Sequence, residues 1–263
     1  MTGYTTIRLE HSDAGVATLT FDRPDHFNGV TVTMAAEMTD ALERVAADRD
    51  VRVLVLTGAG RSFCPGSDVH GFNAAGGPAP ADVSPLASDI SLPIRLYELP
   101  IPTIAAVNGA CAGAGFGFAC ACDLRVAARS ALFRSSFLTV GVAGDMGLPW
   151  LLPRLVGEAT AKRLSLLDEK LTAEQALDLG LVTSVHDDAD FPAAVAALAE
   201  HLAGRAPLAA RVLKQHYLTA ARVDFRTFID LEFQRHHHLL ATDDAREGFA
   251  AFGERREPRF SGR

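Results

Sequence analysis

The sequence lacks the features that mark several other classes of protein. Its four cysteines, Cys64, Cys111, Cys120 and Cys122, form no C-x-x-C pair and are not accompanied by histidines at metal-ligand spacing. No apolar run reaches the ~20 residues that a membrane-spanning helix needs. The first ten residues have neither the basic nor the apolar region of a signal peptide. We therefore expect a cytoplasmic protein with free cysteines, no bound metal and no membrane contact.

Positive charge is also scarce. The 263 residues carry 25 Lys and Arg against 32 Asp and Glu, which gives a formal net charge of −7. This balance argues against a nucleic-acid-binding protein, because such proteins rely on contacts to phosphates. A small anionic ligand stays compatible with it, since that needs only a few local cations. With 48% hydrophobic residues, the chain has enough apolar surface to bury a core.

Apolar runs alternate with helical patterns over residues 1–190. Strands are predicted by the runs at 7–10, 16–21, 51–57, 103–107, 124–128 and 181–185. A helix with one apolar face is predicted to follow Thr33 as its N-cap. From Phe191 to Phe252 the pattern is helical only. We therefore predict an α/β protein with a β/α core over residues 1–190 and a helical region over residues 191–263.

Two further segments carry local signals. Residues 73–88 are rich in Gly, Pro, Ala and Ser and show no periodicity, which predicts a long loop. Thr172 and Gln175 have the spacing of a capping box, in which the threonine side chain bonds one backbone amide and the glutamine reaches back to another. The short helix that follows is predicted to end at Gly180.

Two glycine-containing turns each follow a predicted buried strand: GAGRSFCPGSD (Gly58 to Asp68) and NGACAGAGFGFACACD (Asn108 to Asp123). The second matches a dinucleotide-binding fingerprint poorly, because Gly117 comes one residue early and no acidic residue follows at the distance that ribose binding requires. A better use of the two turns is to supply one backbone N–H each to a shared anion hole. Tight packing of strand against helix explains the glycines equally well, and both explanations stay open on these grounds.

Five segments, taken in order, resemble signatures of the crotonase, or enoyl-CoA hydratase/isomerase, family: FDRPDHFNGVT, GAGRSFCPGSDV, PTIAAVNGACAGAGFGFACACDLRVAA, TAEQALDLGLV and TDDAREGFAAFGERREPRF. The resemblance runs from about residue 7 to residue 260. It implies a superhelix of ββα units with a C-terminal all-helical trimerisation region, assembled as a homotrimer or as a hexamer of two trimers. It also implies an acyl-CoA thioester as substrate, so that coenzyme A is part of the substrate and no separate cofactor is expected.

The resemblance further implies an oxyanion hole formed by the main-chain amides of Ser67 and Ala114. The hydratases of the family use two glutamates, and their positions correspond here to Gly117 and Phe137. Neither side chain can transfer a proton. Hydration by the usual pair of carboxylates therefore has no evident machinery in this chain.

Asp145 is the predicted catalytic residue. It occupies a position at which some isomerase-like and dehalogenase-like members of the family carry aspartate. Apolar residues follow it at Leu148–Trp150, and desolvation there would raise its pKa toward the range useful for proton abstraction. The alternative is a turn-forming aspartate that bonds its own backbone.

The remaining candidates are predicted to line the path of the substrate and of coenzyme A. Cys64 has no cationic partner in the sequence and is interpreted as a small lining residue, and Asp68 as a cap of the turn after Ser67. Arg255, with Arg256 as an alternative, matches a basic residue that contacts a CoA phosphate from a neighbouring subunit. The full set is His26, Phe27, Cys64, Gly66, Asp68, Val69, Gly117, Phe137, Val140, Gly141 and Arg255.

The sequence thus predicts an acyl-CoA enzyme that stabilises a thioester enolate. Isomerisation of a double bond fits a single carboxylate best, and hydration with water held by the backbone is the near alternative. A non-catalytic acyl-CoA-binding homologue is the alternative from a different functional class.

Overall fold

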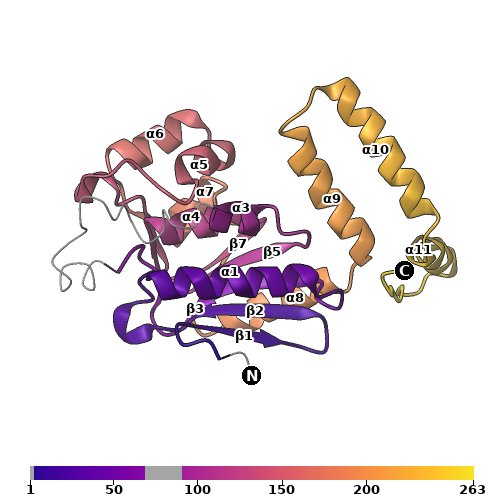
Figure 1. Cartoon of the computed structure of the whole chain (residues 1–263), viewed down its shortest axis with the longest axis horizontal. Coiled ribbons are helices and arrows are strands. Elements are labelled where there is room, and N and C mark those ends of the chain that lie inside the picture. The colour runs from indigo at the N-terminus through magenta and orange to yellow at the C-terminus, as the bar shows by residue number, and fades with distance from the viewer. Residues whose placement is uncertain (1–2, 69–90) are drawn as a thin grey trace.

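The computed structural model describes residues 3–68 and 91–263, so that Val69 and the predicted loop at 73–88 lie outside the described residues. Two sheets form the centre of the molecule, with helices around them (Figure 1). The strands are β1 (Ile7–His11), β2 (Val16–Phe21), β3 (Val53–Gly58), β4 (Ser62–Cys64), β5 (Thr103–Val107), β6 (Ala110–Ala112), β7 (Leu124–Ala128), β8 (Leu132–Arg134), β9 (Leu171–Thr172) and β10 (Ser184–His186). The helices are α1 (Val32–Ala47), α3 (Ser91–Tyr97), α4 (Ala114–Ala121), α5 (Leu148–Val156), α6 (Glu158–Leu166), α7 (Ala173–Asp178), α8 (Phe191–Ala203), α9 (Pro207–Ala220), α10 (Phe225–Leu240) and α11 (Asp243–Glu254).

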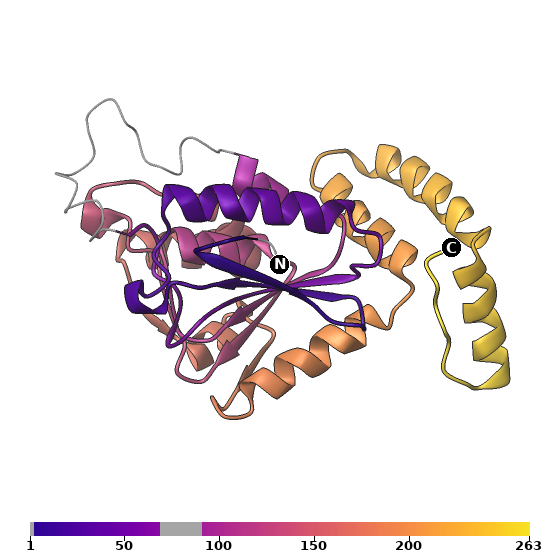
Figure 2. The same cartoon turned by 60° about the horizontal axis from the view of Figure 1, so that its bottom comes forward.

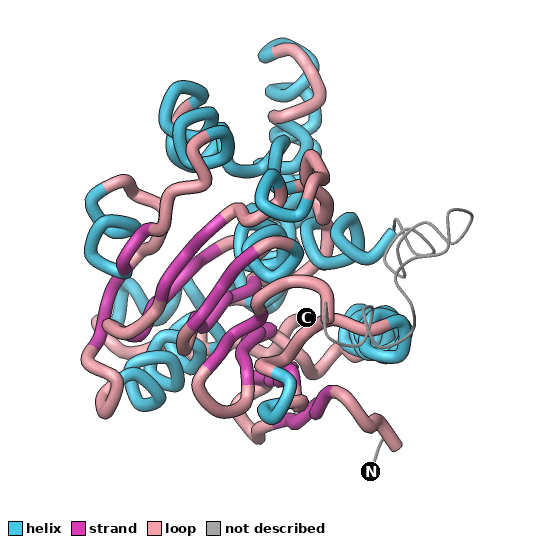
Figure 3. Tube along the Cα trace, turned by 90° about the vertical axis from the view of Figure 1, so that its left-hand side faces the viewer, coloured by secondary structure: helices cyan, strands magenta, loops and turns pink. Residues whose placement is uncertain are grey.

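The larger sheet has the strand order β1-β2-β3-β5-β7-β10, and its strands lie side by side between layers of helix (Figure 3). Only β1 is antiparallel to its neighbour, and the pairs from β2 to β10 are parallel. Residues 53–56 of β3 are buried without alternation. This is the pattern of a parallel strand that is covered on both faces.

A second, four-stranded sheet has the order β4-β6-β8-β9. Each of its first three strands follows a strand of the larger sheet after a short turn, so that β3 leads to β4, β5 to β6 and β7 to β8. Helix α4 follows β6 directly. The predicted winding of ββα units is therefore confirmed.

Helices cover the two faces of the larger sheet differently (Figure 2). Helix α1 buries Met34, Met38 and Leu42 on one side, and α8 packs on the other side with Val195 and Ala199. Helix α4 is buried along its whole length, as expected for a helix that is apolar all round. The two glycine-containing turns are carried by this buried helix and by the short strands beside it.

The helix ends test the predicted caps. The N-cap of α1 is Thr31, whose side chain accepts a hydrogen bond from the amide of Met34 at 3.1 Å. The prediction of Thr33 is wrong, because that residue already lies inside the first turn. The capping box of Thr172 and Gln175 is confirmed in both directions, at 3.2 Å and 2.9 Å. Gly180 has a φ of +69°, as predicted for the end of α7.

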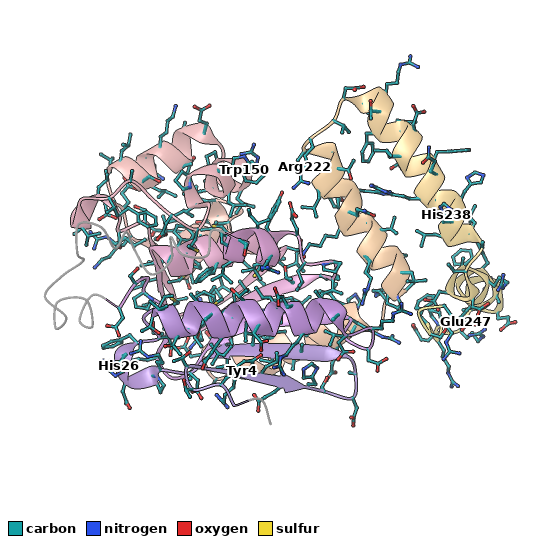
Figure 4. The ribbon with its side chains drawn as sticks, in the orientation of Figure 1. Tyr4, His26, Trp150, Arg222, His238 and Glu247 are labelled. Atoms are coloured by element: carbon teal, nitrogen blue, oxygen red, sulfur yellow. The ribbon has the colours of Figure 1, made fainter. Side chains whose placement is uncertain are left out.

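Helices α9 to α11 lie beyond the sheets (Figure 1). Helix α9 is fastened to the core by Lys214, whose Nζ donates to the Ile101 carbonyl at 3.0 Å and to Asp123 Oδ2 at 2.7 Å. At the far end of α9, Arg222 pairs with Glu98 and lies near Trp150 of α5 (Figure 4). Within the described part of the chain, we find no helix that is both long and apolar enough to span a membrane.

Candidate active site

The two glycine-containing turns meet in space. Strands β4 and β6 are parallel neighbours, so that the turns after them leave the same edge of the small sheet. A Cβ added to Gly66 would lie 3.4 Å from the amide nitrogen of Ala114, and one added to Gly113 would lie 3.5 Å from the Gly66 Cα. Gly66 and Gly113 have φ values of +104° and +52°. Glycine is favoured at both positions by this backbone conformation, which L side chains rarely adopt.

The amide of Ser67 is directed by pairing with the segment around Val30. The amide of Val30 donates to the Gly66 carbonyl at 2.8 Å, and the amide of Asp68 donates to the Val30 carbonyl at 3.0 Å. Ser67 lies between Gly66 and Asp68, the two residues that bond Val30. In a parallel pairing, such a middle residue directs its own N–H away from the paired segment. The Ser67 amide therefore faces away from Val30.

The amide of Ala114 is available for a different reason. Ala114 is the first residue of α4, and the first amides of a helix have no intrahelical acceptor and lie at the positive end of its dipole. Among residues 3–68 and 91–263, neither Ser67 nor Ala114 donates its amide to a protein acceptor. The turns thus present two unbonded backbone donors on adjoining segments.

Asp145 lies on the loop between the 3₁₀ turn Leu138–Val140 and α5. Gly144, Met146 and Gly147 in this loop all have positive φ values, of 130°, 47° and 73°. The loop rests on α4 at Gly117, where a Cβ would come within 2.6 Å of the Met146 Cβ and 3.0 Å of the Met146 carbonyl oxygen. Gly117 is therefore the point at which the loop approaches the helix, and it is packed against Met146.

One oxygen of the Asp145 carboxyl is buried. This atom, Oδ1, accepts no hydrogen bond among the described residues, so the alternative of an aspartate bonded to its own backbone is not supported. Burial raises the pKa of Asp145 above its ordinary value. Burial also raises the pKa of the Cys64 thiol to about 12, and the charge of Asp145 adds to that increase. Asp145 therefore acts electrostatically on the strand end that leads into the Gly66–Ser67 turn.

Phe137 fills the space between the Ala114 turn and the Asp145 loop. Its ring atoms lie 4.0 Å from the position of a Cβ on Gly113 and 3.8 Å from that of a Cβ on Gly144. The side chain is 9% exposed. Val140 and Gly141 follow it and are exposed. The structure thus brings Phe137 to the predicted site and leaves Val140 and Gly141 at its outer edge.

Asp68, His26 and Phe27 lie on the segments that hold the Ser67 turn. The carboxylate of Asp68 pairs with the Arg23 guanidinium at 2.9 Å. His26 ends a short 3₁₀ turn (Figure 4), and Phe27 follows it with a φ of +53°. The Arg61 guanidinium lies over the Phe27 ring, 4.5 Å from its centroid. Sequence reasoning missed Arg23 and Arg61, although both stand within the quoted motifs.

Arg255 is not brought to this site within the chain. It ends α11 in the helical region, which lies at the far side of the molecule from His26, as the position of Glu247 in Figure 4 shows. Arg256 is held by Glu247 and Glu254, each at 2.6 Å. Arg255 is exposed and forms no ion pair with any described residue. Its predicted contact with coenzyme A therefore requires another subunit.

A cavity of about 720 Å³ lies elsewhere, between α8 and the face of the larger sheet that α8 covers. Val16, Val55 and Val195 contribute to its walls, and none of the predicted site residues does. The described residues contain no group of three or more His, Cys, Asp or Glu side chains placed to hold a metal ion. The arrangement around Ser67, Ala114 and Asp145 instead combines two amide donors with one desolvated carboxyl.

Comparisons with known proteins identify the family of the chain. The family model described as enoyl-CoA hydratase/isomerase matches residues 11–263. The chain is 40% identical to the 1,2-epoxyphenylacetyl-CoA isomerase of Escherichia coli over 97% of its own length and 98% of the relative's. It is 34% identical to the (E)-benzylidenesuccinyl-CoA hydratase of Thauera aromatica, over 94% and 96% of the two chains. The crystal structure of an enoyl-CoA hydratase from Bacillus anthracis superposes with a TM-score of 0.93 at 29% identity, covering 98% of this chain and 100% of that one. The protein therefore belongs to the enoyl-CoA hydratase/isomerase, or crotonase, family.

Proposed function

We propose that the protein is an acyl-CoA isomerase that moves a double bond through a thioester enolate. The observation that carries this proposal is the buried Oδ1 of Asp145, which has no hydrogen-bond partner among the described residues and whose charge acts on Cys64, two residues before Gly66. Gly117 and Phe137 stand where the hydratases of the family are expected to carry glutamate. One carboxyl is enough for isomerisation, because the same group removes a proton from one carbon and returns it to another.

In the proposed mechanism, the amides of Ser67 and Ala114 donate to the thioester oxygen. Asp145 takes a proton from the α or γ carbon, the C–H electron pair enters the conjugated system, and negative charge collects on that oxygen. The protonated Asp145 then delivers the proton to the other end of the system, and the double bond shifts. Each amide donor is worth roughly 3–4 kcal/mol of barrier in a comparable oxyanion hole.

We further propose that the acyl group carries an aromatic ring. The names of the Escherichia coli and Thauera aromatica relatives describe acyl groups with a phenyl ring. Phe137, packed between the two loops of the site, offers a face or edge for such a ring. Coenzyme A would enter with the substrate, so that the proposal needs no separate cofactor.

The proposed assembly is a homotrimer or a hexamer of two trimers in the cytoplasm. Large apolar side chains on α9 to α11 support it, because single chains rarely expose so many. They are Leu213, Tyr217, Phe225, Ile229, Phe233, Leu240, Phe249 and Phe252. In such an assembly Arg255 of a neighbouring copy would be available to a CoA phosphate.

Mass spectrometry in heavy-oxygen water tests the reaction. A panel of enoyl-CoA thioesters, with and without a phenyl ring, is incubated with the protein and with Asp145→Asn. Isomerisation leaves the mass of the product unchanged and is lost in Asp145→Asn. Uptake of heavy oxygen would instead indicate hydration, and unchanged turnover in Asp145→Asn would remove Asp145 from the mechanism. Binding without conversion of any thioester would favour a non-catalytic acyl-CoA-binding protein.

A further inference from the structure

A shielded ion pair lies directly behind the Ser67 turn. Arg23 Nη2 donates to Asp68 Oδ2 at 2.9 Å, and the two side chains are only 16% and 10% exposed. The same guanidinium donates through Nη1 to the carbonyl of Gly29 at 2.6 Å. One side chain therefore joins the residue after Ser67 to the segment that precedes Val30.

The Arg23 end of this connection is itself fixed. Asn28 is fully buried, and its Oδ1 accepts from the Arg23 amide at 3.0 Å. Its Nδ2 donates to the carbonyls of Ala59 and Ser62 at 2.9 Å and 2.7 Å. Asn28 has a φ of +66°, a conformation that asparagine tolerates better than most residues. Arg23 is thus anchored to the β3–β4 turn, and its guanidinium has little freedom to follow a moving Asp68.

The Asp68 end is fixed at close range. A Cβ on Gly29 would lie 3.1 Å from both the Cα and the Cβ of Asp68. The backbone bonds of Val30 to Gly66 and Asp68 enclose Ser67 on either side. The orientation of the Ser67 peptide therefore depends on the two backbone bonds, the close contact at Gly29 and the Arg23–Asp68 pair.

We propose that Arg23 is a positioning residue for the oxyanion hole: its ion pair with Asp68 holds the Ser67 amide in the direction that the thioester oxygen requires. The inference rests on the proposed function, because that function uses the Ser67 amide. Arg23 also has an electrostatic effect. Without the guanidinium, the Asp68 carboxylate would add negative potential near an oxygen that is itself becoming negative.

The test compares Arg23→Gln with Arg8→Gln. Arg8 also pairs with an aspartate, Asp22, at 2.8 Å, but its side chain is 50% exposed and lies on the edge strand β1. Two quantities are measured for each variant. The first is the split between kcat and KM for isomerisation of the enoyl-CoA substrate. The second is the stretching frequency of a carbon-13-labelled thioester carbonyl in a bound saturated acyl-CoA, which hydrogen bonds from the oxyanion hole lower.

For Arg23→Gln we expect kcat to fall by at least about tenfold with a smaller change in KM, because a small misplacement of a catalytic group is costly. The carbonyl frequency should return toward its value in water. Arg8→Gln should match the wild type in both measurements. In the double variant Arg23→Gln/Asp68→Asn, two neutral amides can bond each other without an added charge, so part of kcat and of the frequency shift should return.

The outcomes separate this inference from the proposed function. If the wild type shows neither isomerisation nor a carbonyl shift, the proposed function fails. If the wild type shows both and Arg23→Gln keeps both, Arg23 does not position the hole and the inference is overturned. Should Arg23→Gln not fold, Arg23→Lys and Asp68→Asn decide. Arg23→Lys can still form the ion pair and should keep most of the carbonyl shift, whereas Asp68→Asn removes the charge of the pair and should lose part of that shift. A wild-type carbonyl shift in Asp68→Asn would also overturn the inference.

Discussion

Met146 lies directly on Gly117, with the Met146 Cβ only 2.6 Å from the place that a Cβ on Gly117 would take. Met146 holds a φ of +47°, which is uncommon for a side chain of its kind. This contact lets the loop that carries the neighbouring Asp145 lie close to α4. The missing side chain at residue 117 is therefore part of how the single carboxyl is placed.

Gly117→Ala should move the Asp145 loop. The added methyl group gains ~1 kcal/mol of helix propensity, but it collides with the backbone and Cβ of Met146, and overpacking costs ~1–3 kcal/mol. We expect a slightly less stable protein whose kcat falls on the order of ten- to hundredfold, since a shift of ~1 Å at a reacting group has that effect. Urea unfolding and isomerase kinetics measure the two quantities.

Gly253→Ala is the matched control for that substitution. Gly253 lies in α11 with nothing within 4 Å of its added Cβ, so the helix propensity of alanine should raise the free energy of unfolding by ~0.5–1 kcal/mol and leave kcat unchanged. Wild-type activity in Gly117→Ala would show that the loop tolerates the collision. The contact of Met146 with Gly117 would then not determine the position of Asp145.

The parts of the fold that the sequence predicts are those with local signals. Five of the six predicted strands of the larger sheet appear as runs of apolar residues, and the capping box of Thr172 and Gln175 depends on neighbours only three residues apart. The strand predicted at 181–185 is wrong in its first three residues, because β10 spans Ser184–His186 and the buried Leu181 and Val182 precede it. The strands of the smaller sheet are two or three residues long, too short to show a period. Thr31 rather than Thr33 caps α1 because its extended backbone lets the side chain reach Met34, and the two threonines look alike in the sequence.

The candidate site also has features with a local sequence signal and features without one. The glycine turns at Gly66 and Gly113 were visible as motifs, because positive φ angles favour glycine. The pair of Arg23 and Asp68 was not, since 45 residues separate its members and no local pattern links them. The contact between Met146 and Gly117 also cannot be predicted from the sequence, because it depends on how the loop that carries Asp145 packs against α4. Contacts of this kind come from tertiary packing, and the hydrophobic periodicity of a sequence carries no information about them.

Asp168→Asn should weaken the segment that carries Phe137. The Asp168 carboxylate accepts from the amide of Ser136 at 2.8 Å and from Thr139 and Arg134. Burial alone would raise its pKa, but these hydrogen bonds lower it below the ordinary value of 3.8. Asparagine tolerates the φ of +51° at this position. Its Nδ2 group donates and does not accept, so the substitution removes the charge and the contacts of Oδ2 with Thr139 and Arg134. We expect a loss of about 1–2 kcal/mol of unfolding free energy at pH 7.

The contribution of Asp168 to the free energy of unfolding depends on pH. A carboxyl whose pKa is lowered in the folded state stabilises the protein above the unfolded value, and this contribution disappears as the pH falls through the folded value. The difference between wild type and Asp168→Asn should therefore shrink below pH ~4. Urea unfolding at several pH values measures it, and a constant difference would mean that the charge of Asp168 is not what holds the segment.

Phe252→Asp should reduce the size of the assembly. Phe252 is 88% exposed on α11, and a carboxylate in place of a buried interface aromatic would leave an uncompensated charge. Light scattering should show a shift from three or six copies toward one. Leu166→Asp is the control, because Leu166 is 67% exposed on α6 and lies outside α9 to α11. If the wild type is already a single chain at micromolar concentration, the proposed assembly is wrong.

Asp145→Asn should abolish isomerisation and yet stabilise the fold near neutral pH. Burial raises the pKa of Asp145 above its ordinary value of 3.8, so the folded protein binds a proton more tightly than the unfolded chain does. Its contribution to stability is therefore complete below the unfolded value and is lost as the pH rises through the folded value. Asparagine keeps the shape of the side chain without the charge, and it should raise the unfolding free energy at pH 7 by about 1 kcal/mol. Near pH ~3.5 wild type and variant should converge. Thermal unfolding across this pH range separates a lost proton carrier from a damaged fold, since damage would lower the Tm of the variant at every pH.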